Sequence, residues 1–228
     1  MIAYIPARKG SKRIKNKNIL KIGKRPLIEI VVRKLNKLSF IKKIFVSTDC
    51  NSIKKISENS GAVCCDLRKK NLSGDKVTFM DLIKYDLPRY CEFANENNVL
   101  FTLATAILIK EKILNDAFKQ FSNKKPDILM SCEENSHPIW WAMRKKKSGY
   151  LEPIFKNKLN KNSQFLEKTY IDSGMFYFFN LKKINKYKSH KSARKVLPFA
   201  LDFENRCDLN TLDDLKLLKY KFKDFKND

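Results

Sequence analysis

Histidine is scarce in this chain, and its six cysteines include no CxxC pair. Only two of the 228 residues are histidines, His137 and His190. Structural zinc sites take four nitrogen or sulfur ligands, usually from cysteines and histidines at short spacing. The composition therefore argues against a zinc centre, and we interpret the cysteines as reduced thiols of a reducing compartment.

Long apolar runs are also missing. No stretch approaches the roughly 20 apolar residues that a membrane-spanning helix needs. The opening MIAYIPA is too short for a signal peptide and lacks its cationic start. We therefore expect a cytoplasmic protein without a membrane partner.

Acidic residues are outnumbered by basic ones, with 24 Asp and Glu against 48 Lys and Arg and a net charge of +24. One explanation is a polyanion partner such as nucleic acid. The other is a lysine-rich composition spread over solvated surfaces. We favour the second, because the basic residues do not gather in one tail and no zinc-finger, RNP-like or recognition-helix pattern is present.

Strand-like apolar runs alternate with segments of helical period. The predicted strands are 1–7, 43–47, 62–65, 98–103, 127–131 and 171–180. The predicted helices are 26–38, 52–60, 79–94 with a break near Pro88, 110–121, and a last one capped by Thr211 with Asp214. Repeated βα units predict an α/β fold with three α/β/α layers and a mainly parallel sheet. The length suits one domain over residues 1–228.

The regular pattern is lost between Glu133 and Thr169, where aromatic residues mix with basic and polar ones. We expect an excursion from the sheet near residues 136–170, built around two strands. Such an element is a candidate for pairing with a second subunit, with Trp140 and Trp141 packed at the interface. The sequence thus predicts a homodimer.

A basic loop follows the first strand. Ligands of α/β sheets bind beyond the carboxyl ends of the strands. Gly10 and Ser11 would let the backbone approach a phosphate, and Arg8 and Lys17 would neutralise its oxygens. The loop has neither the GxxxxGK[ST] nor the GxGxxG pattern. By its chemistry alone it is as typical of a solvated charge run as of a phosphate site.

The order of residues in this loop is more specific. IPARKGSKRIKNKNI, residues 5–19, resembles the signature IPARGGSKRIPRKNI of the acylneuraminate cytidylyltransferase family, also called CMP-sialic acid synthetases. VSTD at 46–49 resembles the family's VSTDD strand end, and LR at 67–68 with LSGD at 72–75 resembles its LRP..LS.D loop. The resemblance implies a nucleotide-diphospho-sugar-transferase-like (Rossmann-like) fold and binding of CTP by Arg8, Gly10, Ser11, Lys17, Asn18, Arg68 and Asp75.

Two further blocks resemble the pseudaminic acid branch of the same family. ATA at 104–106 resembles its ATAP, with Ile107 in place of proline, and SQFLEKTYIDSGMFYFF at 163–179 resembles its SQDLPEAYHDAGQFYW. The resemblance implies contacts to a sugar by Thr105, Gln164, Tyr170 and Asp172. Asn162, Phe165 and Met175 depart from the branch in the region expected to shape the sugar pocket.

The segment CDLNTLDD at 207–214 resembles the family's DIDTPED. Alternation in an extended segment puts positions 208 and 210 on one side, where Asp208 and Asn210 would hold Mg²⁺. Asn210 stands where the family has a second acid. A helix N-cap with Asp213 and Asp214 in its first turn is an alternative for the same residues.

Together these blocks imply a CTP-dependent nucleotidyltransferase. It would join CMP to a nine-carbon 2-keto acid sugar, pseudaminic acid or a related nonulosonic acid, and release pyrophosphate. Arg8, Lys17 and Asp208 would be the catalytic residues, because they would stabilise charge on the triphosphate. The alternative is a nucleotide-binding relative with lost or altered catalysis, which the changes at Asn162 and Asn210 motivate.

Overall fold

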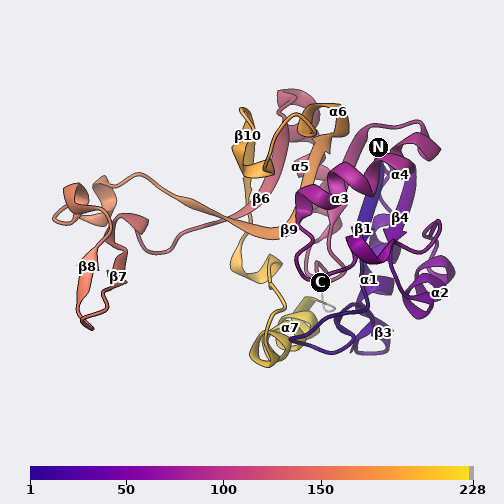
Figure 1. Ribbon diagram of the computed structural model, residues 1–228, viewed down its shortest axis with the longest axis horizontal. Coiled ribbons are helices and arrows are strands. Elements are labelled where there is room, and N and C mark those ends of the chain that lie inside the picture. The colour runs from indigo at the N-terminus through magenta and orange to yellow at the C-terminus, as the bar shows by residue number, and fades with distance from the viewer. Residues whose placement is uncertain (226–228) are drawn as a thin grey trace.

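A mixed, mainly parallel sheet forms the centre of the computed structural model, which describes residues 1–225 (Figure 1). Its strand order is β10-β6-β9-β5-β1-β4. The bounds are β1 (Ile2–Pro6), β4 (Lys43–Ser47), β5 (Asn98–Thr102), β6 (Ile128–Glu134), β9 (Tyr170–Asn180) and β10 (Val196–Ala200). Neighbours are parallel except at β9, which runs antiparallel to both β5 and β6. The predicted α/β fold is confirmed, whereas the direction of β9 and the strand β10 were not predicted.

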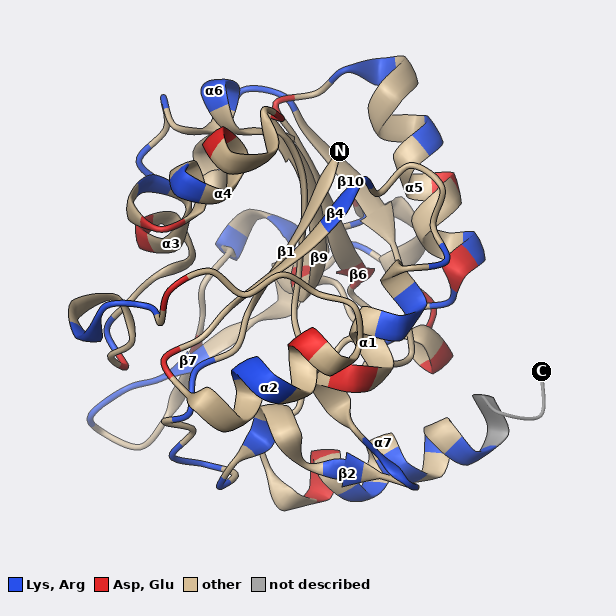
Figure 2. Ribbon diagram, turned by 90° about the vertical axis from the view of Figure 1, so that its right-hand side faces the viewer, with Lys and Arg blue, Asp and Glu red and all other residues tan. Residues whose placement is uncertain are grey.

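Helices cover both faces of this sheet, as the view along it shows (Figure 2). One face carries α1 (Leu27–Leu35), α2 (Asn51–Asn59) and α5 (Glu111–Lys124), and the other carries α3 (Phe79–Tyr85), α4 (Leu87–Ala94) and α6 (Leu181–Ile184). The chain also forms a small hairpin of β2 (Lys21–Ile22) and β3 (Arg25–Pro26), and the last described element is α7 (Leu212–Phe225). None of the described helices is long and apolar enough to cross a membrane.

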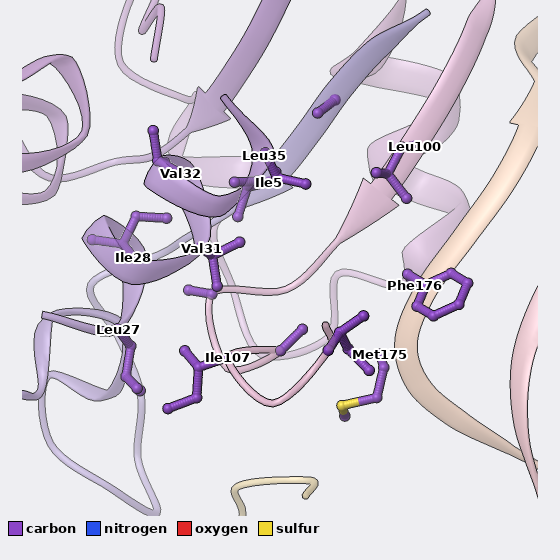
Figure 3. Packing of buried hydrophobic residues seen from close by; sticks show 14 of the residues in the cluster. Ile5, Leu27, Ile28, Val31, Val32, Leu35, Leu100, Ile107, Met175 and Phe176 are labelled. Carbon is purple, nitrogen blue, oxygen red and sulfur yellow. The ribbon is translucent and has the colours of Figure 1, made fainter. Parts of the chain in front are cut away.

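Alternation along the strands divides the core into two clusters. On β1, Ala3 and Ile5 enter the cluster under α1 and α5, while Ile2 and Tyr4 enter the cluster under α3 and α4. Figure 3 shows the first cluster, in which Ile107 lies between Leu27 and Met175 in this view. Met175 is only 1% exposed. It belongs to the core, and the expectation that its region shapes the sugar pocket stays a prediction.

Two local predictions have clear outcomes. Residues 62–65 form a single bridge between Val63 and Phe45, so the predicted strand is wrong. The chain then continues beside the end of β4, where the backbone N–H of Arg68 donates to the carbonyl of Thr48 at 2.7 Å. The predicted break in 79–94 is confirmed, since α3 and α4 meet at Asp86 and Pro88 lies in the first turn of α4.

Residues 136–169, which we call the arm, leave the sheet between β6 and β9 (Figure 1). The arm contains the antiparallel pair β7 (Met143–Lys145) and β8 (Leu151–Pro153) and three short 3-10 helices, η3 (Ile139–Trp141), η4 (Lys156–Lys158) and η5 (Ser163–Phe165). Trp140 packs inside the arm, with its ring 5.3 Å from that of Phe155. Tyr150 and Phe165 are exposed at 77% and 72%. The use of the arm in pairing subunits stays a prediction.

Candidate active site

A pocket of about 560 Å³ opens at the carboxyl ends of β1 and β5. Three loops build it, those that follow β1, α2 and β5. Its polar lining residues are Arg8, Ser11, Lys12, Arg13, Lys17, Asn18, Arg68, Asp75 and Thr105. Five of these side chains are cationic and one is a carboxylate. A pocket of this composition suits a highly charged anion.

The loop after β1 is held against the end of β4. The N–H of Ala7 donates to the carbonyl of Ser47 at 2.8 Å, and the N–H of Lys9 donates to Oδ1 of Asp49 at 2.8 Å. The loop ends at Asn16, whose positive φ of 56° is one that asparagine tolerates. The 3-10 helix η1 (Lys17–Ile19) then turns Asn18 back, and its amide donates to the carbonyl of Arg8 at 2.8 Å. Asn18 therefore braces the loop.

Gly10 lies on the same loop but does not line the pocket. A Cβ at this position would meet nothing within 4 Å. Close packing against protein therefore does not explain the glycine. Its predicted part in nucleotide binding stays a prediction.

Asp75 lies between two of the pocket's cations. Nη2 of Arg8 is 2.8 Å from Oδ1 of Asp75, and Nζ of Lys12 is 2.5 Å from Oδ2. The hydrogen bond from Lys12, with that from Arg8, lowers the pKa of Asp75. The carboxylate thus takes the position between Arg8 and Lys12 that a phosphate group would favour.

Arg68 is a buried residue, with only 5% of its surface exposed. Its Nε lies 3.4 Å from Oγ of Ser73, while Nη1 is buried without a hydrogen-bond partner among the described residues. Leaving a charged donor unsatisfied in the interior costs more than an ordinary lost hydrogen bond. Because Arg68 also lines the pocket, an acceptor on a bound ligand would remove this cost.

Lys17 joins the pocket to the segment before α7. Its Nζ donates to the carbonyl of Leu209 at 2.8 Å, between Asp208 and Asn210. Burial lowers the pKa of Lys17, and the neighbouring Asp208 acts in the opposite direction. Lys17 therefore fixes the segment predicted to hold the metal as well as lining the predicted triphosphate pocket.

Asp208 and Asn210 lie side by side. The Asn210 amide donates to the Asp208 carboxylate, which is exposed. No group of three or more Asp, Glu, His or Cys within residues 1–225 is placed to hold a metal ion. One carboxylate and one amide oxygen nevertheless fit Mg²⁺, which usually takes one or two protein ligands and completes its shell with water and substrate phosphates.

The helix-cap alternative for the same segment is also present. The backbone N–H groups of Asn210 and Thr211 donate to Oδ2 of Asp214 at 2.8 and 2.7 Å. Oγ1 of Thr211 accepts in return from the N–H of Asp214 at 3.1 Å. The bond from Asn210 lowers the pKa of Asp214. Asp214 therefore caps the N-terminus of α7, and this cap does not use Asp208.

Asp172 receives four donors. Oδ1 accepts from Tyr177 at 2.7 Å and from the Gly174 N–H at 3.0 Å, and Oδ2 lies 3.2 Å from His190 and 3.1 Å from Lys191. Burial opposes ionisation, but the hydrogen bonds from His190, Tyr177 and Gly174 hold the pKa of Asp172 well below its usual range. His190 was not predicted as a site residue, and its only signal in the sequence is the rarity of histidine in the chain.

The predicted sugar-binding residues are not brought together within one chain. Thr105 lines the pocket, and Asp172 lies near the start of β9. Tyr170 is exposed on β9, and Gln164 lies in η5 on the arm, which projects away from the body (Figure 1). The predicted nucleotide residues, in contrast, gather around one pocket, with Gly10 on the loop beside it.

Comparison with known proteins gives consistent matches. A model of the family described as Cytidylyltransferase matches residues 2–204. A pseudaminic acid cytidylyltransferase of Campylobacter jejuni is 28% identical, over 97% of this chain and 96% of the relative. An N-acylneuraminate cytidylyltransferase of Escherichia coli is 34% identical over 95% of this chain, which covers 51% of that longer protein.

Solved structures show the same fold at lower identity. The structure of a CMP:2-keto-3-deoxy-manno-octonic acid synthetase complexed with CTP superposes with a TM-score of 0.71. It shares 12% identity and covers 98% of both chains. A 4-diphosphocytidyl-2C-methyl-D-erythritol synthase gives a TM-score of 0.67, also at 12% identity, over 97% of both chains. These likenesses concern the fold alone.

Proposed function

Because the chain belongs to the cytidylyltransferase family, we propose that it transfers CMP from CTP to a nine-carbon 2-keto acid sugar and releases pyrophosphate. The sugar is pseudaminic acid or a closely related nonulosonic acid. The near full-length match to pseudaminic acid cytidylyltransferases supports this class of substrate. The observation that carries the proposal is the buried, unpartnered nitrogen of Arg68 in a pocket with four further cations.

In the proposed reaction the anomeric hydroxyl oxygen of the sugar attacks the α-phosphorus of CTP. The bond from that phosphorus to the β-phosphate bridging oxygen breaks, and the hydroxyl proton passes to solvent. Arg8 and Lys17 hold the triphosphate and stabilise its growing charge, with Ser11 and Asn18 beside them and Arg68 contacting the nucleotide. Positioning supplies much of the remaining acceleration.

Asp208 and Asn210 would hold Mg²⁺ at the edge of this pocket. The ion would supply positive charge to the triphosphate when bound. Lys17 keeps the two residues close to the phosphate-binding loop through its bond to the Leu209 carbonyl.

We also propose that two copies pair through the arm. The arm exposes apolar side chains at Tyr150, Leu151 and Phe165. Gln164 lies on the arm as well, away from its own chain's pocket (Figure 1). In a dimer it would serve the sugar site of the partner subunit, which explains how a residue so placed could contact substrate.

The state of the cysteines supports a cytoplasmic location for the protein. All six cysteines are free thiols in the described chain. Free, mostly buried thiols are typical of proteins kept in a reducing compartment. Cys64, Cys91, Cys132 and Cys207 are the buried ones.

With Mg²⁺ present, purified protein should release pyrophosphate from CTP when at least one member of a panel of nonulosonic acids is added. ATP, GTP and UTP serve as matched controls. Folded protein that stays silent across the panel contradicts the proposed catalysis. If that protein still binds CTP, the second candidate applies, a nucleotide-binding relative, which the replacement of an acid by Asn210 favours.

A further inference from the structure

Lys34 on α1 is a buried lysine, with 9% of its surface exposed. Its Nζ donates to the carbonyl oxygens of Ile107 and Ile109 at 2.5 and 2.6 Å. Both carbonyls belong to residues 103–110, the loop that follows β5, which we call the β5 loop. One ammonium group therefore links a helix on the face of the sheet to a loop at its carboxyl edge.

The β5 loop needs this donor because it lies in the interior. Residues 104–109 are all buried, and the loop makes its own bonds from Ala106 to the Leu103 carbonyl and from Ile109 to the Ala106 carbonyl. A buried carbonyl without a partner destabilises the segment that carries it. A methionine at position 34 would match the surrounding apolar core better than an ammonium does. The two carbonyl contacts are thus the physical advantage of a lysine here.

The Ile107 side chain is fully buried in the core. Its backbone carbonyl is bonded by Lys34, a residue 73 positions earlier in the chain. The middle of the β5 loop is therefore held by its apolar side chain and by this one ammonium group.

The β5 loop also forms part of the candidate active site. Leu103 and Thr105 line the pocket, while the other end of the loop is bonded to α1. The predicted triphosphate residues Arg8 and Lys17 come from a different loop, which is braced through Asn18 and Asp49. The two walls of the pocket are therefore fixed by separate sets of bonds.

We propose that Lys34 is a positioning residue for the acceptor sugar, acting by holding the β5 loop so that Thr105 keeps its place in the pocket wall. This inference rests on the proposed function. Lys34 holds the β5 loop, which carries Thr105, and not the loop after β1, which carries Arg8 and Lys17. Its replacement must therefore affect binding of the sugar and of CTP to different extents.

The test compares Lys34→Met with Arg33→Met, a control that removes an exposed cation from the same helix. The Arg33 side chain is 49% exposed and pairs with Glu29 on α1. For Lys34→Met we expect KM for the sugar to rise about tenfold, the scale of one lost hydrogen-bonding group, with KM for CTP unchanged within about twofold. Amide hydrogen exchange in residues 103–110 should speed up in the same variant. Arg33→Met should change none of these quantities.

Equal rises in both KM values, or no change in either, would overturn the proposal. If Lys34→Met does not fold, Lys34→Arg tests the same claim, since it keeps a cationic donor in a different shape. There we expect a smaller rise, roughly threefold, again confined to the sugar. Amide hydrogen exchange in residues 103–110 requires no substrate. An unchanged exchange rate in the variant therefore contradicts the proposed hold of Lys34 on the β5 loop, even if the wild-type protein is inactive on every nonulosonic acid.

Discussion

Arg68 combines burial, positive charge and an unpartnered nitrogen, and this combination is the strongest single-residue sign of a ligand. We expect Arg68→Met to weaken CTP binding by about ten- to a hundredfold, because a hydrogen bond to a charged group contributes roughly 1.5–3 kcal/mol. Isothermal titration calorimetry measures this directly. Arg33→Met, which removes an exposed arginine of α1, is the control. Wild-type affinity in the Arg68 variant would show that the nucleotide does not use this residue.

We expect the Asp75 carboxylate to compete with the nucleotide phosphates for Arg8 and Lys12. This carboxylate already pairs with Arg8 and Lys12, so a triphosphate has to displace it from at least one of them. We expect Asp75→Asn to bind pyrophosphate up to roughly fivefold more tightly, the scale of an exposed ion pair. Asp116→Asn, which removes an exposed carboxylate from α5, should leave the affinity unchanged. Weaker binding by Asp75→Asn would mean that the carboxylate itself holds the ligand or its metal.

Lys34 also gives stability a defined pH dependence. Burial lowers its pKa to about 7 from an ordinary 10.5, with Glu111 opposing the shift and Lys37 adding to it. Between these two pH values the unfolded chain binds more protons than the folded one, so Lys34 makes folding more favourable as pH rises. The neutral amine keeps two N–H donors for the two carbonyls.

Urea unfolding at pH 7 and pH 9 tests this shift. The free energy of unfolding of the wild type, minus that of Lys34→Met, should increase over this interval. The slope cannot exceed about 1.4 kcal/mol per pH unit for one proton. A difference that falls or stays flat would show that the ammonium is not destabilised by burial.

At the scale of elements, strands and helices with strong patterns were predictable. The buried runs at β1, β4 and β5 are short and almost wholly apolar, as expected for a parallel sheet covered on both faces. Residues 62–65 look similar but make one bridge only, between Val63 and Phe45. How far a short apolar run pairs depends on a strand distant in the sequence, which local sequence does not show.

The candidate site was predictable only in part for a similar reason. The residues around the first loop could be found from their order in the chain, and the structure brings most of them to one pocket. His190 and Lys34 could not, since each acts through partners that are distant in sequence, Asp172 and the β5 loop. Isolated residues of this kind show their role only when the chain is folded.

The arm is an element that can be removed without cutting the sheet. Its two ends meet where the N–H of Asn135 donates to the Thr169 carbonyl at 2.9 Å. Replacing residues 137–167 by a short Gly-Ser turn should therefore leave β6 and β9 paired. We expect the shortened protein to be a monomer by light scattering, while the intact chain is a dimer. CTP binding should be retained and sugar transfer lost. An intact chain that is itself monomeric would contradict the proposed pairing.

At the scale of the whole molecule, the net charge of +24 has a simple physical explanation. Figure 2 shows Lys and Arg on helices and loops around the fold and not in one patch. Such a distribution is typical of a solvated lysine-rich surface. It also raises the positive potential around a pocket that itself has five cations and one carboxylate, which favours the approach of two anionic substrates.

The mass of the nucleotide product shows whether this protein joins CMP to a nonulosonic acid. Protein, CTP, Mg²⁺ and pseudaminic acid or a related sugar should yield a product with the mass of CMP plus the sugar less one water, together with one pyrophosphate. The yield should fall when Arg68 is replaced by methionine. Unchanged CTP and sugar after incubation of folded, CTP-binding protein with every acid of this class would show that the protein does not transfer CMP to these sugars.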